Sequence, residues 1–157
     1  MLFRSVICLA GDGSLQMNIQ ELQTIVQNNL PVKIFILNNN GYLSIRNSQK
    51  GFFGDVVGES SESGVSFPDM VRVADAYGIS AYRLDTADFE SVLCDALNLP
   101  GPVICDVMLD PEQGFEPRQS SRQLPDGRIV SAPLEDMYPF LDRDELLENL
   151  LIPPWEE

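Results

Sequence analysis

Two polar residues follow apolar runs that could bring them to one place. Asp12 lies in the Gly-Asp-Gly sequence directly after the apolar run 5–10, and Asn39 follows a second apolar run, 32–37. Both runs are rich in aliphatic residues and are expected to be buried parallel strands, whose carboxyl ends meet at one edge of a sheet. A carboxylate and an amide oxygen beside a glycine-rich turn suit a hard cation that carries phosphate oxygens.

Helical and strand patterns alternate along the rest of the chain. The stretch between the two apolar runs has apolar residues at helical spacing and ends at Pro31, and Asn18 with Glu21 has the form of a capping box. Strands alternating with helices predict an α/β fold, a parallel sheet with helices on both faces. The other expected elements are strands over 79–84 and 103–109 and helices that begin at Ser66 to Asp69, at Thr86 and at Asp142.

The composition limits the classes of partner. The 157 residues carry a net charge of −14 and no histidine, which argues against nucleic acid and an anionic membrane. Cys8, Cys94 and Cys105 lack metal-binding spacing, and two of them lie in strand-like runs, so reduced core thiols in a reducing, cytoplasmic compartment are expected. No signal-peptide pattern is visible, and no apolar run has the length needed to cross a bilayer.

Two stretches fall outside the alternating pattern. Residues 47–66, rich in glycine, serine and acidic residues, are expected to form a mobile loop. Residues 111–141 contain five prolines, and so long a loop is usually functional or bound to a partner. Asp126-Gly127 is expected to form a hairpin turn within it. The dense positive charges there could meet an anionic substrate or a partner subunit, although a solvated surface role is favoured for each one alone: Arg118, Arg122 and Arg128.

At the polar residues the sequence resembles a known family. Gly11-Asp12-Gly13, followed after residues 14–37 by Asn38-Asn39, resembles the thiamine diphosphate (ThDP) binding motif of the acetolactate synthase and pyruvate decarboxylase superfamily. The resemblance runs from about Arg4 to about Asp110. It also covers flanking segments of the motif: Ser14 to Leu22, Asn39 to Tyr42, Phe67 to Asp69, Ala74 to Ile79 and Gly101 to Ile104.

The resemblance implies a cofactor site. The Asp12 carboxylate, the Asn39 side chain and the carbonyl of Gly41 would bind Mg²⁺, with two diphosphate oxygens and a water completing the shell. Gln49 with Phe52-Phe53 resembles a substrate-side wall, and a loop whose phenylalanines merely tuck under it is an equal alternative. The simpler alternative for the motif is that Asp12 caps a helix and 38–41 form an ordinary turn. The cofactor-binding residues implied are Gly11, Asp12, Gly13, Ser14, Asn39, Gly41 and Tyr42.

The resemblance also implies how the chain is organised. Residues 1–110 would be the domain that binds the diphosphate and Mg²⁺, incomplete at its N-terminus, and 111–157 a proline-rich extension with a terminal helix packed on it. In the family a separate pyrimidine-binding domain supplies the glutamate that activates the cofactor. The chain is therefore expected to need that domain or subunit as a partner, to form a homo- or hetero-oligomer, and to be inactive alone.

The reaction implied is decarboxylation or carboligation of a 2-keto acid. Carboligation resembling acetolactate synthase is the leading interpretation, from the long match at 14–21. Asn40-Gly41-Tyr42 resembles the decarboxylases instead, since acetolactate synthases commonly have a carboxylate at the position of Gly41. A non-catalytic ThDP-binding subunit or truncated remnant remains open, as does a generic nucleotide-binding α/β domain with a coincidental Gly-Asp-Gly sequence.

Overall fold

The computed structural model describes residues 5–85, 88–123 and 126–152. Contacts within the chain divide it into two compact units, Met1–Glu112 and Gln113–Glu157, and each unit is described by itself. The boundary falls close to the one expected from the sequence. That the second unit packs on the first remains a prediction.

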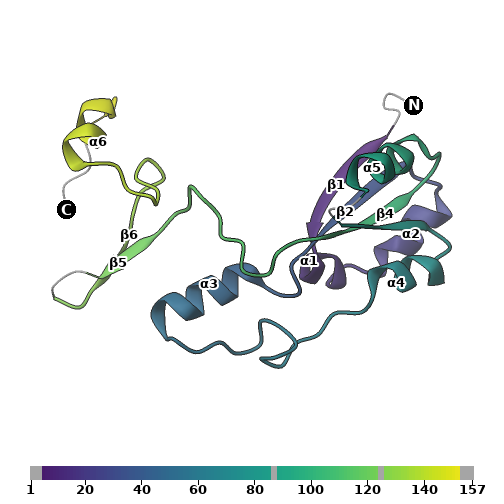
Figure 1. Ribbon diagram of the computed structural model, residues 1–157, viewed down its shortest axis with the longest axis horizontal. Helices are drawn as coiled ribbons and strands as arrows, with labels where there is room; N and C mark the ends of the chain where they lie inside the picture. Colours follow the sequence, from purple (N-terminus) through teal and green to yellow (C-terminus); the bar gives the residue numbers. More distant parts are fainter. Residues whose placement is uncertain (1–4, 86–87, 124–125, 153–157) are drawn as a thin grey trace. The chain divides into compact units, whose positions relative to one another are not determined.

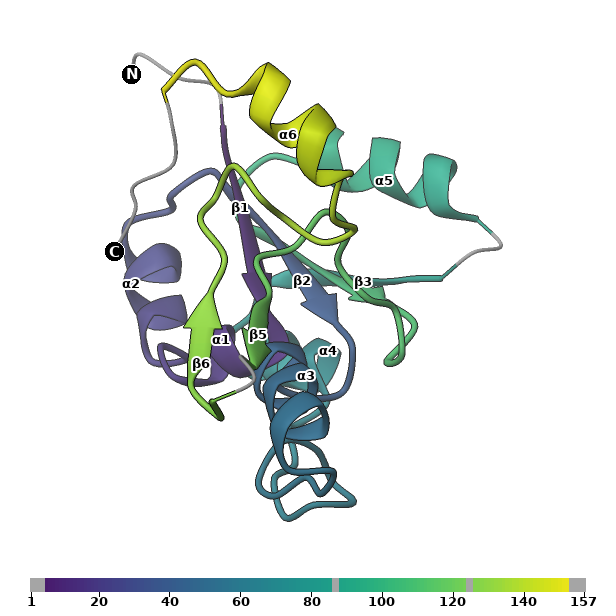
Figure 2. The same cartoon turned by 90° about the vertical axis from the view of Figure 1, so that its left-hand side faces the viewer.

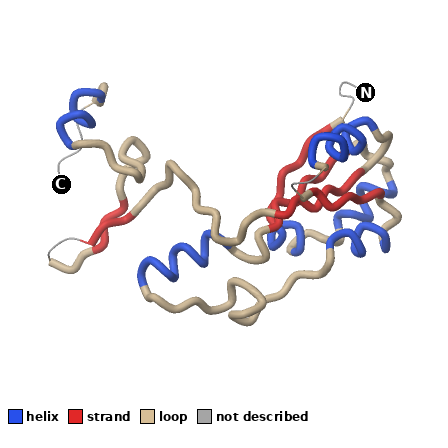
Figure 3. Tube along the Cα trace, in the orientation of Figure 1, coloured by secondary structure: helices blue, strands red, loops and turns tan. Residues whose placement is uncertain are grey.

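The first unit is built on a four-stranded parallel sheet (Figures 1 and 3). The strands are β1 (Val6–Gly11), β2 (Val32–Asn38), β3 (Ser80–Leu84) and β4 (Val103–Met108), in the order β1-β2-β4-β3. All three pairings are parallel, and the register aligns Gly11 with Leu37. The expected parallel sheet is therefore confirmed.

Helices cover both faces of this sheet. On β2, Ile34 and Ile36 face one layer, which contains α2 (Glu21–Gln27) and α4 (Met70–Ala76). Phe35 faces the opposite layer, which contains α5 (Phe89–Asn98). Because successive side chains of a strand point to opposite faces, a continuous apolar run is what a sheet covered on both faces requires.

The connection after β1 differs from the expectation of one capped helix. It forms two helices, α1 (Asp12–Gln16) and α2, separated by a turn. The capping-box prediction is wrong: Asn18 Nδ2 donates to the Ser14 carbonyl at 3.5 Å, and the Glu21 carboxylate accepts from Thr24 Oγ1 at 3.1 Å. The cap residue of α2 is Gln20 rather than Asn18, and no side chain caps that helix.

The stretch 47–66 is only partly irregular. Helix α3 (Leu43–Phe52) occupies its first residues, and a loop follows to Asp69. The Gln49 amide accepts from the Val57 backbone N–H at 2.6 Å and donates to the Val57 carbonyl at 3.2 Å, which ties the loop back to α3. Phe52 and Phe53 are exposed, and their role as a substrate wall remains a prediction.

The later helices begin and end as their local sequences dictate. Asp69, not Ser66, caps α4, since its carboxylate accepts from the Val71 and Arg72 N–H groups at 3.0 and 3.2 Å. Gly78, with φ of +70°, follows that helix as expected. Thr86 lies outside the described residues, and α5 begins at Phe89.

The second unit contains a small antiparallel hairpin and a helix. Strands β5 (Ser121–Gln123) and β6 (Ile129–Ser131) pair on either side of Asp126-Gly127, as predicted, and Gly127 has φ of +88°. Asp142 caps α6 (Arg143–Asn149) by accepting from the Asp144 N–H at 3.0 Å. Of the three arginines, Arg118 lies over the Tyr138 ring, Arg128 pairs with Asp126, and the Arg122 side chain is outside the description.

Within 5–85, 88–123 and 126–152, no helix is both long and apolar enough to cross a membrane.

The cysteine prediction is only partly correct. Cys105 on β4 is buried, and burial raises its pKa to about 11, but Cys8 and Cys94 are exposed. Cys8 is exposed because β1 is the last strand of the sheet and is little covered by helices. Burial at that strand is a property of tertiary packing, which an apolar run alone does not reveal.

The exposed strand β1 leads to a prediction about assembly. Val6, Ile7 and Leu9 are 52%, 59% and 68% exposed on β1, an end strand of the sheet formed by the described residues. An apolar edge strand is a template for pairing with another chain, so self-association is expected. Leu9→Lys should shift the chain toward monomer in sedimentation velocity, whereas Phe53→Lys, a change at an apolar residue that is 78% exposed, should not. A monomeric wild-type chain would contradict the prediction.

Candidate functional site

The site is built where β1 and β2 end. Their register places Gly11 beside Leu37, so Asp12 and Asn38 emerge at the same edge of the sheet. Figure 2 shows both arrows pointing toward α1 and α3 at that edge. Asp12 begins α1 and Asn39 follows the last residue of β2, so the parallel pairing brings the two motif segments together.

Asp12 is held by backbone groups from both segments. It is 2% exposed, and its carboxylate oxygens accept from the Gly13 N–H at 2.7 Å and the Gly41 N–H at 2.9 Å. Burial raises the pKa of Asp12, the N–H groups of Gly41, Gly13 and Asn40 oppose that rise, and the charge of Asp106 adds to it. The bond to Gly41 reaches across the sheet edge, which a simple helix cap does not do.

Asn39 presents an oxygen without a partner. Its Oδ1 is buried and accepts no hydrogen bond among the described residues. Buried polar atoms in folded proteins are almost always paired, because an unpaired one loses its hydration without compensation. The turn that carries it is tight: Asn40 has φ of +56°, and its N–H donates to Asn38 Oδ1 at 3.1 Å.

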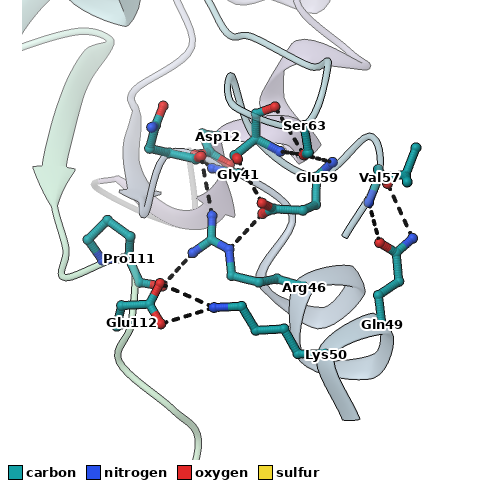
Figure 4. Close-up of polar contacts among 12 residues, drawn as sticks. Asp12, Gly41, Arg46, Gln49, Lys50, Val57, Glu59, Ser63, Pro111 and Glu112 are labelled. Atoms are coloured by element: carbon teal, nitrogen blue, oxygen red, sulfur yellow. Dashed lines mark hydrogen bonds and ion pairs between the residues drawn. The ribbon is translucent and has the colours of Figure 1, made fainter. Parts of the chain in front are cut away.

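Gly41 is required by close packing. A Cβ at this position would lie 2.4 Å from the Glu59 carbonyl oxygen and 2.7 Å from Arg46 Nη2. These distances leave no room for a side chain, so the chain can pass between the Asp12 carboxylate and the Glu59 backbone only at a glycine. Figure 4 shows Gly41 enclosed in this way.

The remaining predicted site residues lie around the start of α1. Gly13 is buried and Ser14 is exposed in the first turn, and Gly11 precedes the helix as its cap residue. The Tyr42 ring lies against Gly13, since a Cβ on Gly13 would be 2.2 Å from the nearest ring atom. The same ring makes an edge-to-face contact with Phe67, with ring centroids 5.3 Å apart. The structure thus gathers the predicted segments at one edge, and their contact with a cofactor remains a prediction.

Sequence reasoning missed two groups of buried charges at this edge. Arg46 Nε donates to Glu59 Oε2 at 2.6 Å, and both residues are 4% exposed. Asp106, 1% exposed, accepts from Asn38 Nδ2 at 2.8 Å and pairs with Arg83 at 3.2 Å. The Asp106 carboxylate lies inside the otherwise apolar strand β4, and this position in the sequence could have predicted a buried charge. No pattern in the sequence predicts that Arg46 pairs with Glu59.

Hydrogen bonds and the ion pair together favour the charged form of Glu59. Burial alone would raise the pKa of Glu59, but the hydrogen bonds from Ser60 and Arg46 and the positive charge of Arg46 hold it below its ordinary value. Glu59 is therefore a carboxylate that is already fully engaged. It is unsuited to accept a proton from a substrate.

The donor set fits a hard cation that brings oxygen ligands of its own. The edge offers the Asp12 carboxylate and the unpaired Asn39 amide oxygen, beside the backbone of Gly41. Across the described parts of the chain, no group of three Asp, Glu, Cys or His side chains is placed to bind a metal. A cation here would need phosphate oxygens as well, which matches the preference of Mg²⁺ for few protein ligands plus phosphate.

A parallel α/β domain with polar groups converging at the carboxyl edge of its sheet defines a class of ligand-binding domain. Residues 2–107 match the family model described as the thiamine pyrophosphate enzyme C-terminal TPP binding domain. The chain belongs to this family, which confirms the resemblance inferred from the sequence.

Relatives and solved structures agree with this membership. The chain is 39% identical over 113 residues to an acetolactate synthase large subunit of Porphyra purpurea, covering 71% of this chain and 19% of the relative. It is 36% identical over 107 residues to the isozyme 2 large subunit of Escherichia coli, covering 68% and 19%. A ThDP-dependent 4-hydroxybenzoylformate decarboxylase of Rhodococcus jostii superposes with a TM-score of 0.58 at 34% identity, covering 68% of this chain and 20% of that one.

The contact between Gly13 and Tyr42 gives a testable coupling. Gly13→Ala is expected to destabilise the fold by about 1–3 kcal/mol, because the new methyl overlaps the Tyr42 ring that Phe67 holds in place. In a Tyr42→Ala background the same change should stabilise α1, since alanine is favoured over glycine in helices by about 1 kcal/mol. Urea unfolding of the four proteins measures the cycle, and equal effects of Gly13→Ala in both backgrounds would rule out the contact.

Proposed function

We propose that this chain is the part of a ThDP-dependent enzyme that binds the diphosphate of ThDP through Mg²⁺, and that the enzyme acts on 2-keto acids. The observation that carries the proposal is the buried, unpaired Asn39 Oδ1 at the edge where Asp12 is held. A bound cation supplies the partner that this oxygen lacks. Family membership supplies the identity of the cofactor.

The residues of the chain would divide the binding between them. Asp12 and the Asn39 side chain would donate oxygen ligands, and the carbonyl of Gly41 is the third protein ligand that the resemblance implies. Gly11, Gly13, Ser14 and Tyr42 would lie along the diphosphate. When bound, ThDP supplies the carbanion chemistry, while the protein supplies binding, orientation and exclusion of water.

Acetolactate synthase-like carboligation remains the leading reaction, because the relatives at 36–39% identity are acetolactate synthases. Decarboxylation is the second candidate, and two observations favour it. The packing of Gly41 against Glu59 excludes the carboxylate expected there in an acetolactate synthase, and the Rhodococcus structure is that of a decarboxylase. A non-catalytic ThDP-binding subunit shares the same site and differs only in lacking turnover.

The chain spans 19% of the length of the Porphyra relative, so turnover is proposed to need a pyrimidine-binding domain or subunit. A homo- or hetero-oligomer would bring the two together. Supplying that partner and following pyruvate would separate the candidates. Acetolactate supports carboligation, an aldehyde supports decarboxylation, and no consumption supports a binding subunit.

Calorimetry tests the binding directly. ThDP should bind in the presence of Mg²⁺ and not after chelation, and ATP with Mg²⁺ should not replace it. Thiamine without phosphates is the matched control, since it lacks the oxygens that the cation requires. Equal binding of ATP and ThDP would favour a generic nucleotide-binding domain and overturn the proposal.

A further inference from the structure

A buried ion pair lies directly behind the turn that carries Asn39 and Gly41. Arg46 and Glu59 meet at 2.6 Å, and each side chain is 5% exposed. Burying two charges removes their hydration, and an apolar pair of similar volume is often as stable or more stable. A gain in stability alone therefore does not explain why these two charges are buried here. The hydrogen bonds that the two side chains make indicate another role.

Arg46 joins three separate segments of the chain. From helix α3 its Nη2 donates to the Asn40 carbonyl at 3.5 Å, and its Nη1 donates to the Pro111 carbonyl beyond β4. Figure 4 shows the guanidinium between these groups and the Glu59 carboxylate. Because the guanidinium is planar with donors in fixed directions, it sets the positions of its partners relative to one another.

Glu59 is fixed just as firmly. Ser60 Oγ donates to its other carboxylate oxygen at 2.7 Å, and Ser63 Oγ accepts from its backbone N–H at 2.9 Å. The Glu59 carbonyl accepts from the Tyr42 N–H at 2.8 Å. The loop therefore meets the turn through both backbone and side chain, on the side of Gly41 where a Cβ has no room.

We propose that Arg46 and Glu59 are positioning residues for the magnesium site. Acting through their contacts with the Asn40 carbonyl and the Tyr42 N–H, they would hold the turn that carries Asn39 Oδ1 and Gly41 in place for a cation. The identity of the ligand rests on the proposed function, and the new element is that affinity for the cation depends on two residues that do not touch it. Groups that orient metal ligands commonly matter in this way.

Two conservative variants test the proposal. Arg46→Lys keeps the positive charge but removes the planar guanidinium and its fixed donors. Glu59→Gln keeps the shape of the side chain but removes its negative charge. Each should weaken Mg²⁺ binding at saturating ThDP by about 10- to 100-fold, measured by titration calorimetry on samples shown to be folded by circular dichroism. Lys50→Met is the control, since Lys50 lies on the same helix in an exposed pair with Glu112 and should leave affinity unchanged.

A second measurement needs no cofactor. In both variants without cofactor, amide hydrogen exchange should be faster than in the wild-type chain at Gly41 and Tyr42, whose N–H groups donate to Asp12 and Glu59. Exchange at Ile104 in the sheet should remain slow. Faster exchange throughout the sheet would instead indicate a purely structural role. Full affinity in Arg46→Lys would indicate that only charge matters, and either result overturns the proposal.

The two measurements separate this inference from the proposed function. A wild-type chain that binds no ThDP with Mg²⁺ would overturn the proposed function, and the exchange experiment would still decide whether the pair holds the turn. Unchanged exchange at Gly41 and Tyr42 in both variants would overturn the inference, even if ThDP binds as proposed.

Discussion

Replacing Asp12 by alanine is expected to abolish magnesium-dependent ThDP binding. Asp12 is the charged oxygen donor proposed for the cation, and burial places its carboxylate where few water molecules could substitute for it. Mg²⁺ demands near-octahedral geometry with short oxygen contacts, so loss of a charged ligand is expected to weaken binding by at least about 100-fold. Isothermal titration with ThDP at fixed Mg²⁺ measures the loss.

The controls for Asp12→Ala lie on the same chain. Asp75→Ala removes an exposed carboxylate from helix α4 and should leave the affinity unchanged. Asn39→Ala should weaken binding by less than Asp12→Ala, because it removes a neutral ligand. Circular dichroism should show that each variant keeps its sheet, and ThDP affinity unchanged in a folded Asp12→Ala chain would rule out the site.

The 157-residue chain, with ThDP and Mg²⁺ in excess, is expected to leave hydrogen–deuterium exchange at ThDP C2 near the rate of free cofactor. The resemblance implies that activation of the cofactor needs a carboxylate that is free to exchange protons. The three buried carboxylates of the described residues are already engaged: Asp12 by backbone N–H groups, Glu59 by Arg46, and Asp106 by Asn38 and Arg83. General acid–base catalysis typically contributes about 10²- to 10⁴-fold, and that contribution should be missing.

Nuclear magnetic resonance of the C2 proton after rapid quenching measures this rate. A complete acetolactate synthase serves as the positive control, and Asp12→Ala, which should not bind the cofactor, gives the background. Exchange accelerated by about 100-fold or more by the wild-type chain alone would show that it carries its own activating group. That result would contradict the proposal that a separate pyrimidine-binding domain is required.

The sheet and its ligand edge follow from local sequence. Apolar runs at 5–10 and 32–37 are long enough for strands and are linked by a helical segment, so parallel pairing and convergence of Asp12 with the 39–41 turn were predictable. Helix α3 was missed because glycine and serine near 47–54 obscured its pattern, although no proline interrupts it.

Other features depend on tertiary contacts that no local pattern encodes. Cys8 has an apolar strand sequence around it and is nevertheless exposed, since burial there depends on what covers β1. The Arg46–Glu59 pair joins a helix to a loop, and in sequence each resembles an ordinary surface charge. Side-chain ion pairs between segments are set by the fold, so only the structure reveals them.

The Asn39 side-chain oxygen, which lacks a partner among the described residues, has a consequence for the lifetime of the protein in a cell. A buried polar atom that lacks a hydrogen-bond partner penalises the cofactor-free state, and a bound cation would relieve that penalty. A ligand that binds only the folded form raises stability in proportion to the logarithm of its free concentration, and degradation draws on the unfolded population. Vitamin and magnesium supply would then set the abundance of this chain as well as its occupancy, with depleted cells clearing it faster.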